Sequence, residues 1–163
     1  MKYYIIAGEA SGDLYGSRLI DEIKSIDREA NIRFWGGDKM ILSGGFNAKH
    51  IKELAFMGFY EVFKNIFTIR KNINFCKKDI CDFNPDKIIY IDYPGFNLLI
   101  SKWAKKKGFK NYYYISPQIW AWKENRIKTI KENIDKLYVI FPFEREYYSD
   151  RHNLKSEFYG HPL

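Results

Sequence analysis

Three short segments of the chain combine polar side chains with glycine or proline in patterns that can support chemistry. Each follows an apolar run, and in chain order they read AGEASGD (7–13), DYPGFN (92–97) and SPQIWAW (116–122). Carboxylates transfer protons, and hydroxyls, amides and indole rings bind sugars and phosphates. Their joint chemistry depends on whether the fold brings the three segments together.

The first segment has the composition of a tight turn that leads into a helix. Gly8 and Gly12 let the backbone turn sharply and approach a ligand, and the free N–H groups of the helix would suit an anion or a hydroxyl. The segment is neither a G-x-G-x-x-G fingerprint nor a phosphate loop with Gly-Lys-Ser/Thr. The alternative is that Ser11 and Asp13 cap the helix and that Glu9 is a solvated acid.

The second segment places Asp92 at the end of an apolar strand. An aspartate at the rim of a sheet, partly shielded from water, is suited to act as a general base. Asn97 follows about one helical turn later and could bind a sugar hydroxyl or cap a helix. The alternative interpretation makes both side chains ordinary turn and cap residues.

The third segment carries two tryptophans, Trp120 and Trp122, only two residues apart. Indole rings stack on sugar rings or acyl chains, and the indole N–H can donate to a hydroxyl or a phosphate. The alternative places both rings in the core, and we expect Trp120 to be the inner one. Lys123 and Arg126 follow at once and could contact a phosphate.

The elements around these segments alternate between strands and helices. We expect strands at 2–7, 32–35, 87–92, 111–116, 136–141 and 157–159. We expect helices after 11–13 and at 40–42, 59–83, 96–107, 124–133 and 142–149. This order predicts one Rossmann-like α/β domain, with a mostly parallel sheet and helices on both faces. Ligands of such sheets bind beyond the carboxyl ends of the strands, where all three segments fall.

The long helix expected at 59–83 has two contrasting faces. One is an apolar stripe that includes Val62, Ile66, Ile73 and Ile80 and is expected to pack on the sheet. The other alternates aromatic and basic side chains, as a helix that lies in a lipid interface does. Its members are Tyr60, Lys64, Phe67, Lys71, Phe75 and Lys78. The alternative is a solvated face with a few stray aromatic rings.

Composition narrows the class of protein. Lysine and arginine outnumber aspartate and glutamate by 27 to 20, so the net charge of +7 favours anionic partners. No apolar run reaches the roughly 20 residues that span a bilayer, and no signal peptide is visible. Cys76 and Cys81 are expected to be free thiols, and the histidines are not spaced as metal ligands. We expect a cytoplasmic protein that uses no metal and no Ser-His-Asp triad and that can still lie on a membrane surface.

Taken in order, six motifs resemble the N-terminal half of bacterial lipid-A-disaccharide synthase. They are AGEASGD (7–13), MGFYEV (57–62), IDYPGFN (91–97), YISPQIWAWKENRIKTIK (114–131), FPFE (141–144) and GHPL (160–163). The resemblance implies the N-terminal domain of a GT-B glycosyltransferase. Residues 1–163 would form a single acceptor-side domain, and the UDP-sugar-binding domain would be absent from this chain.

The family joins UDP-2,3-diacylglucosamine to 2,3-diacylglucosamine 1-phosphate, with release of UDP and inversion of the anomeric centre, and needs no cofactor. In this reaction the resemblance assigns Asp92 as the general base that takes the proton of the acceptor's 6-hydroxyl. The residues expected to bind substrate are Glu9, Ser11, Gly12, Asp13, Asn97, Ser116, Trp120, Trp122 and Arg126. Many relatives have a second aspartate where this chain has Gly95, so that group has no part in the mechanism here.

The lipid substrates imply peripheral association with the inner face of the inner membrane, through Tyr60, Lys64, Phe67 and Lys71. The resemblance implies no nucleic-acid partner and leaves an oligomer open. Because the family's chain is much longer, we expect residues 1–163 to bind the lipid acceptor better than they catalyse. Two alternatives remain: a non-enzymatic lipid- or phosphosugar-binding domain, and a flavodoxin-like nucleotide-binding module, which the missing phosphate fingerprint disfavours.

Overall fold

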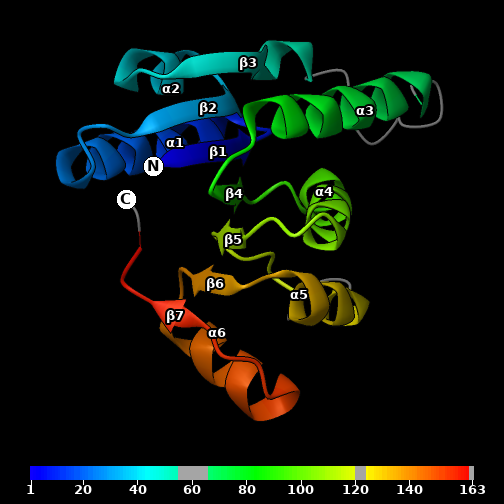
Figure 1. Ribbon diagram of the computed structural model, residues 1–163. Helices are drawn as coiled ribbons and strands as arrows, with labels where there is room; N and C mark the ends of the chain where they lie inside the picture. The colour runs from blue at the N-terminus through cyan, green and yellow to red at the C-terminus, as the bar shows by residue number, and fades with distance from the viewer. Residues whose placement is uncertain (55–65, 120–123, 162–163) are drawn as a thin grey trace.

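The computed structural model describes residues 1–54, 66–119 and 124–161 (Figure 1). The strands are β1 (Lys2–Ala7), β2 (Asn31–Gly36), β3 (Phe46–His50), β4 (Lys87–Ile91), β5 (Asn111–Tyr114), β6 (Lys136–Val139) and β7 (Glu157–Phe158). The helices are α1 (Ala10–Ile26), α2 (Asp38–Ser43), α3 (Ile66–Phe83), α4 (Pro94–Lys106), α5 (Ile127–Asn133) and α6 (Pro142–Glu146). Short 3₁₀ turns cover Ile51–Glu53 and Glu124–Arg126, and a π-helical turn covers Tyr147–Arg151.

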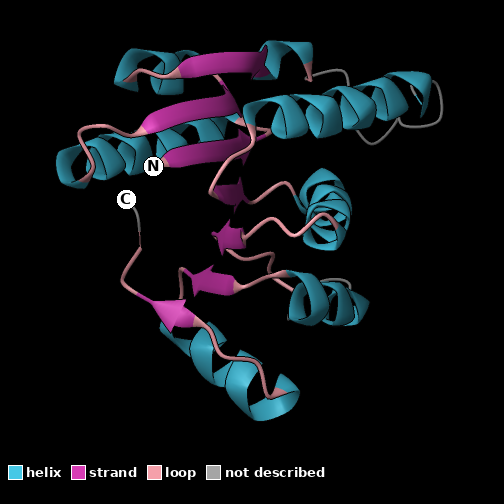
Figure 2. Ribbon diagram, in the orientation of Figure 1, coloured by secondary structure: helices cyan, strands magenta, loops and turns pink. Residues whose placement is uncertain are grey.

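The described strands form one parallel sheet in the order β3-β2-β1-β4-β5-β6-β7 (Figure 2). The Rossmann-like class predicted from the sequence is therefore confirmed. The chain fills the sheet outward from β1 to β3 and then continues from β4 on the other side of β1. The strand order thus reverses between β1 and β4, and in doubly wound sheets a ligand crevice lies beyond the carboxyl ends at this point.

Helices cover both faces of the sheet. Because successive side chains of each strand point to opposite faces, the core consists of two parts, one on each face. On one face α3, α4 and α5 lie side by side, and on the other α1 packs against α2 (Figure 1). Tyr4 and Ile6 of β1 point into the first core, whereas Tyr3, Ile5 and Ala7 point into the second. Successive side chains of a strand face opposite ways, so each strand of this sheet needs apolar residues at nearly every position.

A buried polar network fixes α3 against the sheet. The Tyr4 hydroxyl donates to an Asp79 carboxylate oxygen at 2.7 Å, and the Trp35 indole N–H donates to the Tyr4 oxygen at 2.9 Å. Arg33 of β2 pairs with the other Asp79 oxygen at 2.8 Å. Burial raises the pKa of the Tyr4 hydroxyl, which therefore stays a donor at neutral pH. Together these bonds set which side of α3 faces outward.

The structure differs from the sequence-based expectation at several elements. Strand β3 was not expected, because FNAKH has no apolar run; it lies at the edge of the sheet and pairs with β2. Helix α1 begins at Ala10 with Glu9 as its N-cap, so the expectation that residues 11–13 cap it was wrong. The helix expected at 124–133 is a 3₁₀ turn followed by α5, and the one expected at 142–149 continues as a π-helical turn.

Candidate functional site

The first two segments meet at the carboxyl edge of the sheet, and the third begins beside them. Ala7, the last residue of β1, pairs with Ile91 of β4, and Ile91 pairs in turn with Tyr114 of β5. The three strands end level with one another, so the turns that follow them lie next to each other. The expectation that these segments share one edge is met for the described residues 7–13, 92–97 and 116–119.

Asp92 lies at this edge, immediately after β4, and is half-buried. Burial raises the pKa of its carboxyl above the ordinary value for an aspartate, and the negative charge of Glu9 raises it further. The Tyr93 backbone N–H and the positive charge of Arg126 act in the opposite direction. A carboxylate whose pKa is raised by burial holds a proton more tightly, which is what a general base requires. Glu9 and Arg126 thus come from two other segments of the chain, and both act electrostatically on Asp92.

Asn97 is fully buried in the first part of α4. Its amide nitrogen donates to the backbone carbonyl of Asp92 at 2.7 Å, with longer contacts to the carbonyls of Ile91 at 3.4 Å and Ile6 at 3.5 Å. This arrangement agrees with the structural alternative, in which Asn97 stabilises the turn. Its direct binding of a sugar hydroxyl stays a prediction that the burial of the side chain disfavours.

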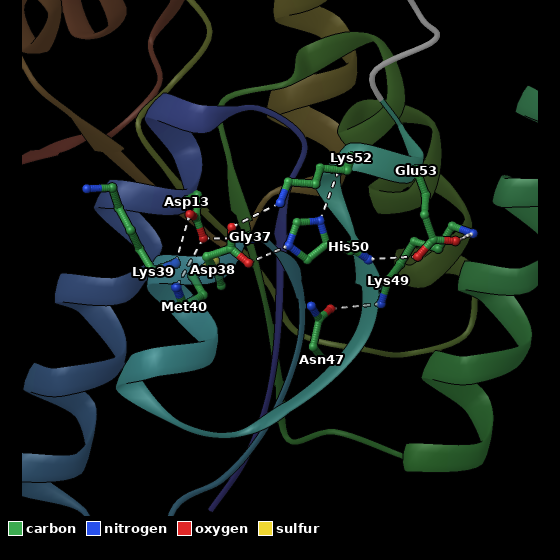
Figure 3. A network of polar contacts seen from close by, with 10 residues as sticks. All are labelled: Asp13, Gly37, Asp38, Lys39, Met40, Asn47, Lys49, His50, Lys52 and Glu53. Atoms are coloured by element: carbon green, nitrogen blue, oxygen red, sulfur yellow. Dashed lines mark hydrogen bonds and ion pairs between the residues drawn. The ribbon is translucent and has the colours of Figure 1, made fainter.

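Asp13 is also buried. Its carboxylate accepts hydrogen bonds from backbone N–H groups of α2 and of Gly37, the residue that precedes α2 (Figure 3). One oxygen accepts from the N–H groups of Gly37 at 2.7 Å and Met40 at 3.1 Å, and the other accepts from Lys39 at 3.1 Å. A carboxylate at the free N–H groups of a helix N-terminus accepts their hydrogen bonds, and its negative charge interacts favourably with the positive end of the helix dipole. Asp13 therefore joins the start of α1 to the start of α2.

The remaining residues of the first segment differ in burial. Glu9 and Ser11 are exposed at the beginning of α1 and are free to face a ligand. Gly12 is buried, and a Cβ atom added there would lie 3.1 Å from the Cβ of Ala7. Gly12 is therefore needed for α1 to approach β1 closely, and its contact with substrate stays a prediction.

A second polar cluster, which the sequence analysis missed, lies beside Asp13 at the ends of β2 and β3 (Figure 3). Asp38 pairs with the His50 Nε2 atom and the Lys52 ammonium, each at 3.2 Å. The Lys52 backbone N–H donates to the His50 Nδ1 atom at 3.1 Å, so the imidazole proton lies on Nε2 and points at Asp38. Asp38 is twelve residues from His50 and fourteen from Lys52 in the sequence, and only the unexpected strand β3 brings them together.

In the third segment Ser116 is buried, and its hydroxyl lies 2.6 Å from that of Tyr148. The Tyr148 hydroxyl also donates to the Pro117 carbonyl at 3.0 Å, which fixes the chain as it leaves β5. Trp120 and Trp122 lie outside the described residues, so their roles stay predictions. Arg126 closes the 3₁₀ turn that follows and is partly exposed.

The outward face of α3 can be followed from Phe67 onward, since Tyr60 and Lys64 lie outside the described residues. Phe67 is 84% exposed and Lys71 is exposed beside it. Phe75 is 42% exposed, but its ring lies 6.0 Å from that of Trp35 and so partly belongs to the core. On the opposite face Cys76 and Ile80 are fully buried and Ile73 packs against the core, as the stripe predicted.

Two further features are absent from the parts of the chain that the structure describes. Residues 1–54, 66–119 and 124–161 contain no group of three or more histidine, cysteine, aspartate or glutamate side chains that could hold a metal ion. Within the same ranges, no helix has both the length and the apolar content needed to cross a membrane.

Comparison with known proteins connects this geometry to one family. A model of the lipid-A-disaccharide synthetase family matches residues 3–163. The lipid-A-disaccharide synthase of Coxiella burnetii (strain Dugway 5J108-111) is 41% identical over 98% of this chain and 42% of its own length. That of Francisella tularensis (strain WY96-3418) is 40% identical over all of this chain and 43% of its own length. The chain thus spans less than half the length of these curated relatives.

Solved structures with low sequence identity share the fold. The UDP-GlcNAc 2-epimerase of Neisseria meningitidis, solved with UDP-GlcNAc, superposes with a TM-score of 0.64 at 11% identity. That match covers 99% of this chain and 47% of the epimerase. The calicheamicin glycosyltransferase CalG4 superposes with a TM-score of 0.52 at 13% identity, over 98% of this chain and 51% of its own. These likenesses support the Rossmann-like fold alone.

Proposed function

The chain belongs to the lipid-A-disaccharide synthetase family, and on that premise we propose that it forms the acceptor-side half of a glycosyltransferase. The reaction would join UDP-2,3-diacylglucosamine to 2,3-diacylglucosamine 1-phosphate. The 6-hydroxyl oxygen of the acceptor would form a bond to C1 of the donor sugar as the bond from C1 to UDP breaks. The products would be the lipid A disaccharide 1-phosphate and UDP, with the anomeric centre inverted.

The observation that carries this proposal is the setting of Asp92. The hydroxyl nucleophile must lose its proton, and a half-buried carboxylate at the switch point of the sheet is placed to accept it. Burial and the charge of Glu9 raise the pKa of Asp92, so the carboxylate is a stronger base than a solvated aspartate. The Tyr93 backbone N–H and the positive charge of Arg126 act against this rise.

The remaining site residues would bind the acceptor. Glu9 and Ser11 are exposed at the start of α1, where they could accept and donate hydrogen bonds to sugar hydroxyls. Arg126 could pair with the acceptor's 1-phosphate, because a guanidinium matches the geometry of phosphate oxygens. The buried Asp13, Asn97 and Ser116 would shape the site from within by holding its turns in place.

The lipid nature of these substrates requires the protein to meet them at a surface. We place that contact on the outward face of α3, where the ring of Phe67 could enter the headgroup region and Lys71 could lie beside lipid phosphates. The protein would then work as a peripheral protein on the inner face of the inner membrane, with Tyr60 and Lys64 extending the same face.

A chimera tests the proposed reaction. Residues 1–163 would replace the matching segment of the Coxiella burnetii lipid-A-disaccharide synthase, and synthesis from the two purified substrates would be followed as release of UDP. We expect activity in the chimera, none in residues 1–163 alone, and a fall of ~10²–10⁴-fold when the chimera carries Asp92→Asn. The unmodified Coxiella burnetii enzyme serves as the positive control.

Three outcomes would count against parts of this proposal. An Asn variant that kept more than half of the activity would place the base elsewhere, with Glu9 and Asp13 as the next carboxylates to test. Disaccharide formed by residues 1–163 alone would show that the donor site does not lie in the part of the relatives that this chain does not span. A chimera that folds and binds the acceptor without turnover would favour the alternative of a non-enzymatic lipid-binding domain.

A further inference from the structure

The turn that carries Asp92 has a backbone conformation that needs outside support. Asp92 has a φ of 44° and Tyr93 a φ of 49°, so two successive residues lie in the left-handed region. Side chains other than glycine rarely adopt this conformation, and a run of two is rarer still. Such a turn persists only when the surrounding structure holds it, and turns of this kind cluster at functional sites.

Two buried side chains supply that support through a single atom, the carbonyl oxygen of Asp92. The Tyr113 hydroxyl donates to it at 2.6 Å and the Asn97 amide nitrogen donates to it at 2.7 Å. Both side chains are fully buried, and they belong to two different elements, β5 and α4. The carbonyl is therefore fixed by two donors that are themselves held by the core.

We propose that Tyr113, assisted by Asn97, is a positioning residue that sets the direction of the Asp92 carboxylate. With the carbonyl held, the peptide after Asp92 cannot rotate, and the left-handed φ fixes where the Cα–Cβ bond points. If the carbonyl were released, the turn would relax toward a negative φ and the carboxylate would swing away from Glu9 and Arg126. The part that this plays in catalysis rests on the proposed function, whereas its effect on the orientation of Asp92 does not.

The chain offers a matched control in the neighbouring tyrosine. Tyr90 of β4 is the sheet partner of Tyr113, and their rings lie 5.7 Å apart. Tyr90 is also fully buried, but its hydroxyl donates to the Asn111 side chain at 2.9 Å. Replacing either tyrosine with phenylalanine removes one buried hydroxyl from the same core, so both variants should lose a similar amount of stability. Only Tyr113→Phe removes one of the two donors that hold the carbonyl of Asp92.

The test follows the ionisation of Asp92 itself in the 163-residue chain. Carbon-13 NMR of the labelled aspartate carboxyl groups, assigned with Asp92→Asn, gives the pKa of Asp92 in each variant. Because the carboxylate would move into water, Tyr113→Phe should lower the pKa of Asp92 toward that of a solvated aspartate. Tyr90→Phe should leave it at the wild-type value. An Asp92 titration that is the same in Tyr113→Phe as in wild type would overturn the proposal.

Kinetics in the Coxiella chimera add a second readout. A misplaced base slows the chemical step and leaves ground-state binding intact, so Tyr113→Phe should lower kcat by roughly 10–100-fold with little change in KM. Equal kcat values for Tyr113→Phe and Tyr90→Phe would reduce Tyr113 to a structural role. If Tyr113→Phe does not fold, Asn97→Ser, which removes the other donor, carries the same two expectations.

The two proposals fail in different ways. A shifted Asp92 titration in Tyr113→Phe, together with a chimera that is inactive even without substitutions, would keep the positioning role and reject the proposed reaction. An active chimera that depends on Asp92, together with an unshifted titration, would keep the reaction and reject the positioning role.

Discussion

The aromatic ring of Tyr93 lies over Gly8 so closely that a Cβ atom added to Gly8 would come within 2.4 Å of it. The ring is also stacked on Phe96, with centroids 5.6 Å apart, which leaves it little room to move away. The glycine that ends the first apolar run is thus required by a side chain from the second segment. This contact joins the turn after β1 to the turn that carries Asp92.

We expect Gly8→Ala to destabilise the protein by about 1–3 kcal/mol, the usual cost of forcing an extra methyl group into a packed site. The clash falls on the ring atoms nearest the Tyr93 backbone, so relief would require the strained turn to move. Urea unfolding would measure the loss. Gly95→Ala is the control, because a Cβ atom there would meet nothing within 4 Å. Equal stability of the two variants would contradict the contact.

We expect Asp13 to stabilise the fold and Ser11 to bind the acceptor. Asp13→Ala would leave the Gly37, Lys39 and Met40 N–H groups without their acceptor, and we expect a loss of about 1–3 kcal/mol in the free energy of unfolding. Ser11→Ala changes an exposed hydroxyl and should leave stability unaltered while weakening acceptor binding. A stable Asp13→Ala protein with weakened acceptor binding would show that Asp13 acts on the ligand.

The pKa of Asp92 predicts a particular dependence of stability on pH. Because its pKa is raised in the folded state, the folded chain binds this proton more tightly than the unfolded chain does. The stabilisation is complete below the ordinary pKa of aspartate and is lost as the pH rises through the folded pKa. Asp92→Asn should therefore gain stability relative to wild type at neutral pH, and the gain should vanish below about pH 4. Thermal melts across this range would measure it, and a difference that does not change with pH would contradict the raised pKa.

The outward face of α3 should bind anionic lipid through Phe67 and Lys71. Replacing them together, as Phe67→Ser with Lys71→Gln, should reduce sedimentation with anionic vesicles and leave the melting temperature unchanged, because both side chains are exposed. Phe75→Ser serves as a contrast, since its ring packs near Trp35 and its loss should lower the melting temperature. Unchanged vesicle binding in the double variant would reject this face as the membrane contact. A large drop in its melting temperature would assign the two side chains to the core.

Much of the fold could be predicted because its main signals are local. The runs at 2–7 and 87–91 are apolar at nearly every position, as central strands buried on both faces must be, and the structure has β1 and β4 there. Strand β3 gave no such signal, since an edge strand buries less and carries polar residues such as Asn47 and Lys49. Its pairing with β2 is a long-range event that no local pattern encodes.

The sequence by itself determined the class of sheet, the edge at which its chemistry lies, and Asp92 as the strand-ending carboxylate, because apolar runs and the turns after them are properties of neighbouring residues. Only the tertiary structure decided which polar residues are exposed to a ligand and which are buried in hydrogen bonds with the protein backbone. Asp13 and Asn97 looked equivalent to Glu9 in the sequence, yet packing buries them against backbone groups from distant elements. Tyr113 shows the same limit: one tyrosine among three in NYYY reaches the carbonyl of Asp92, because alternation along β5 and pairing with β4 direct its hydroxyl there.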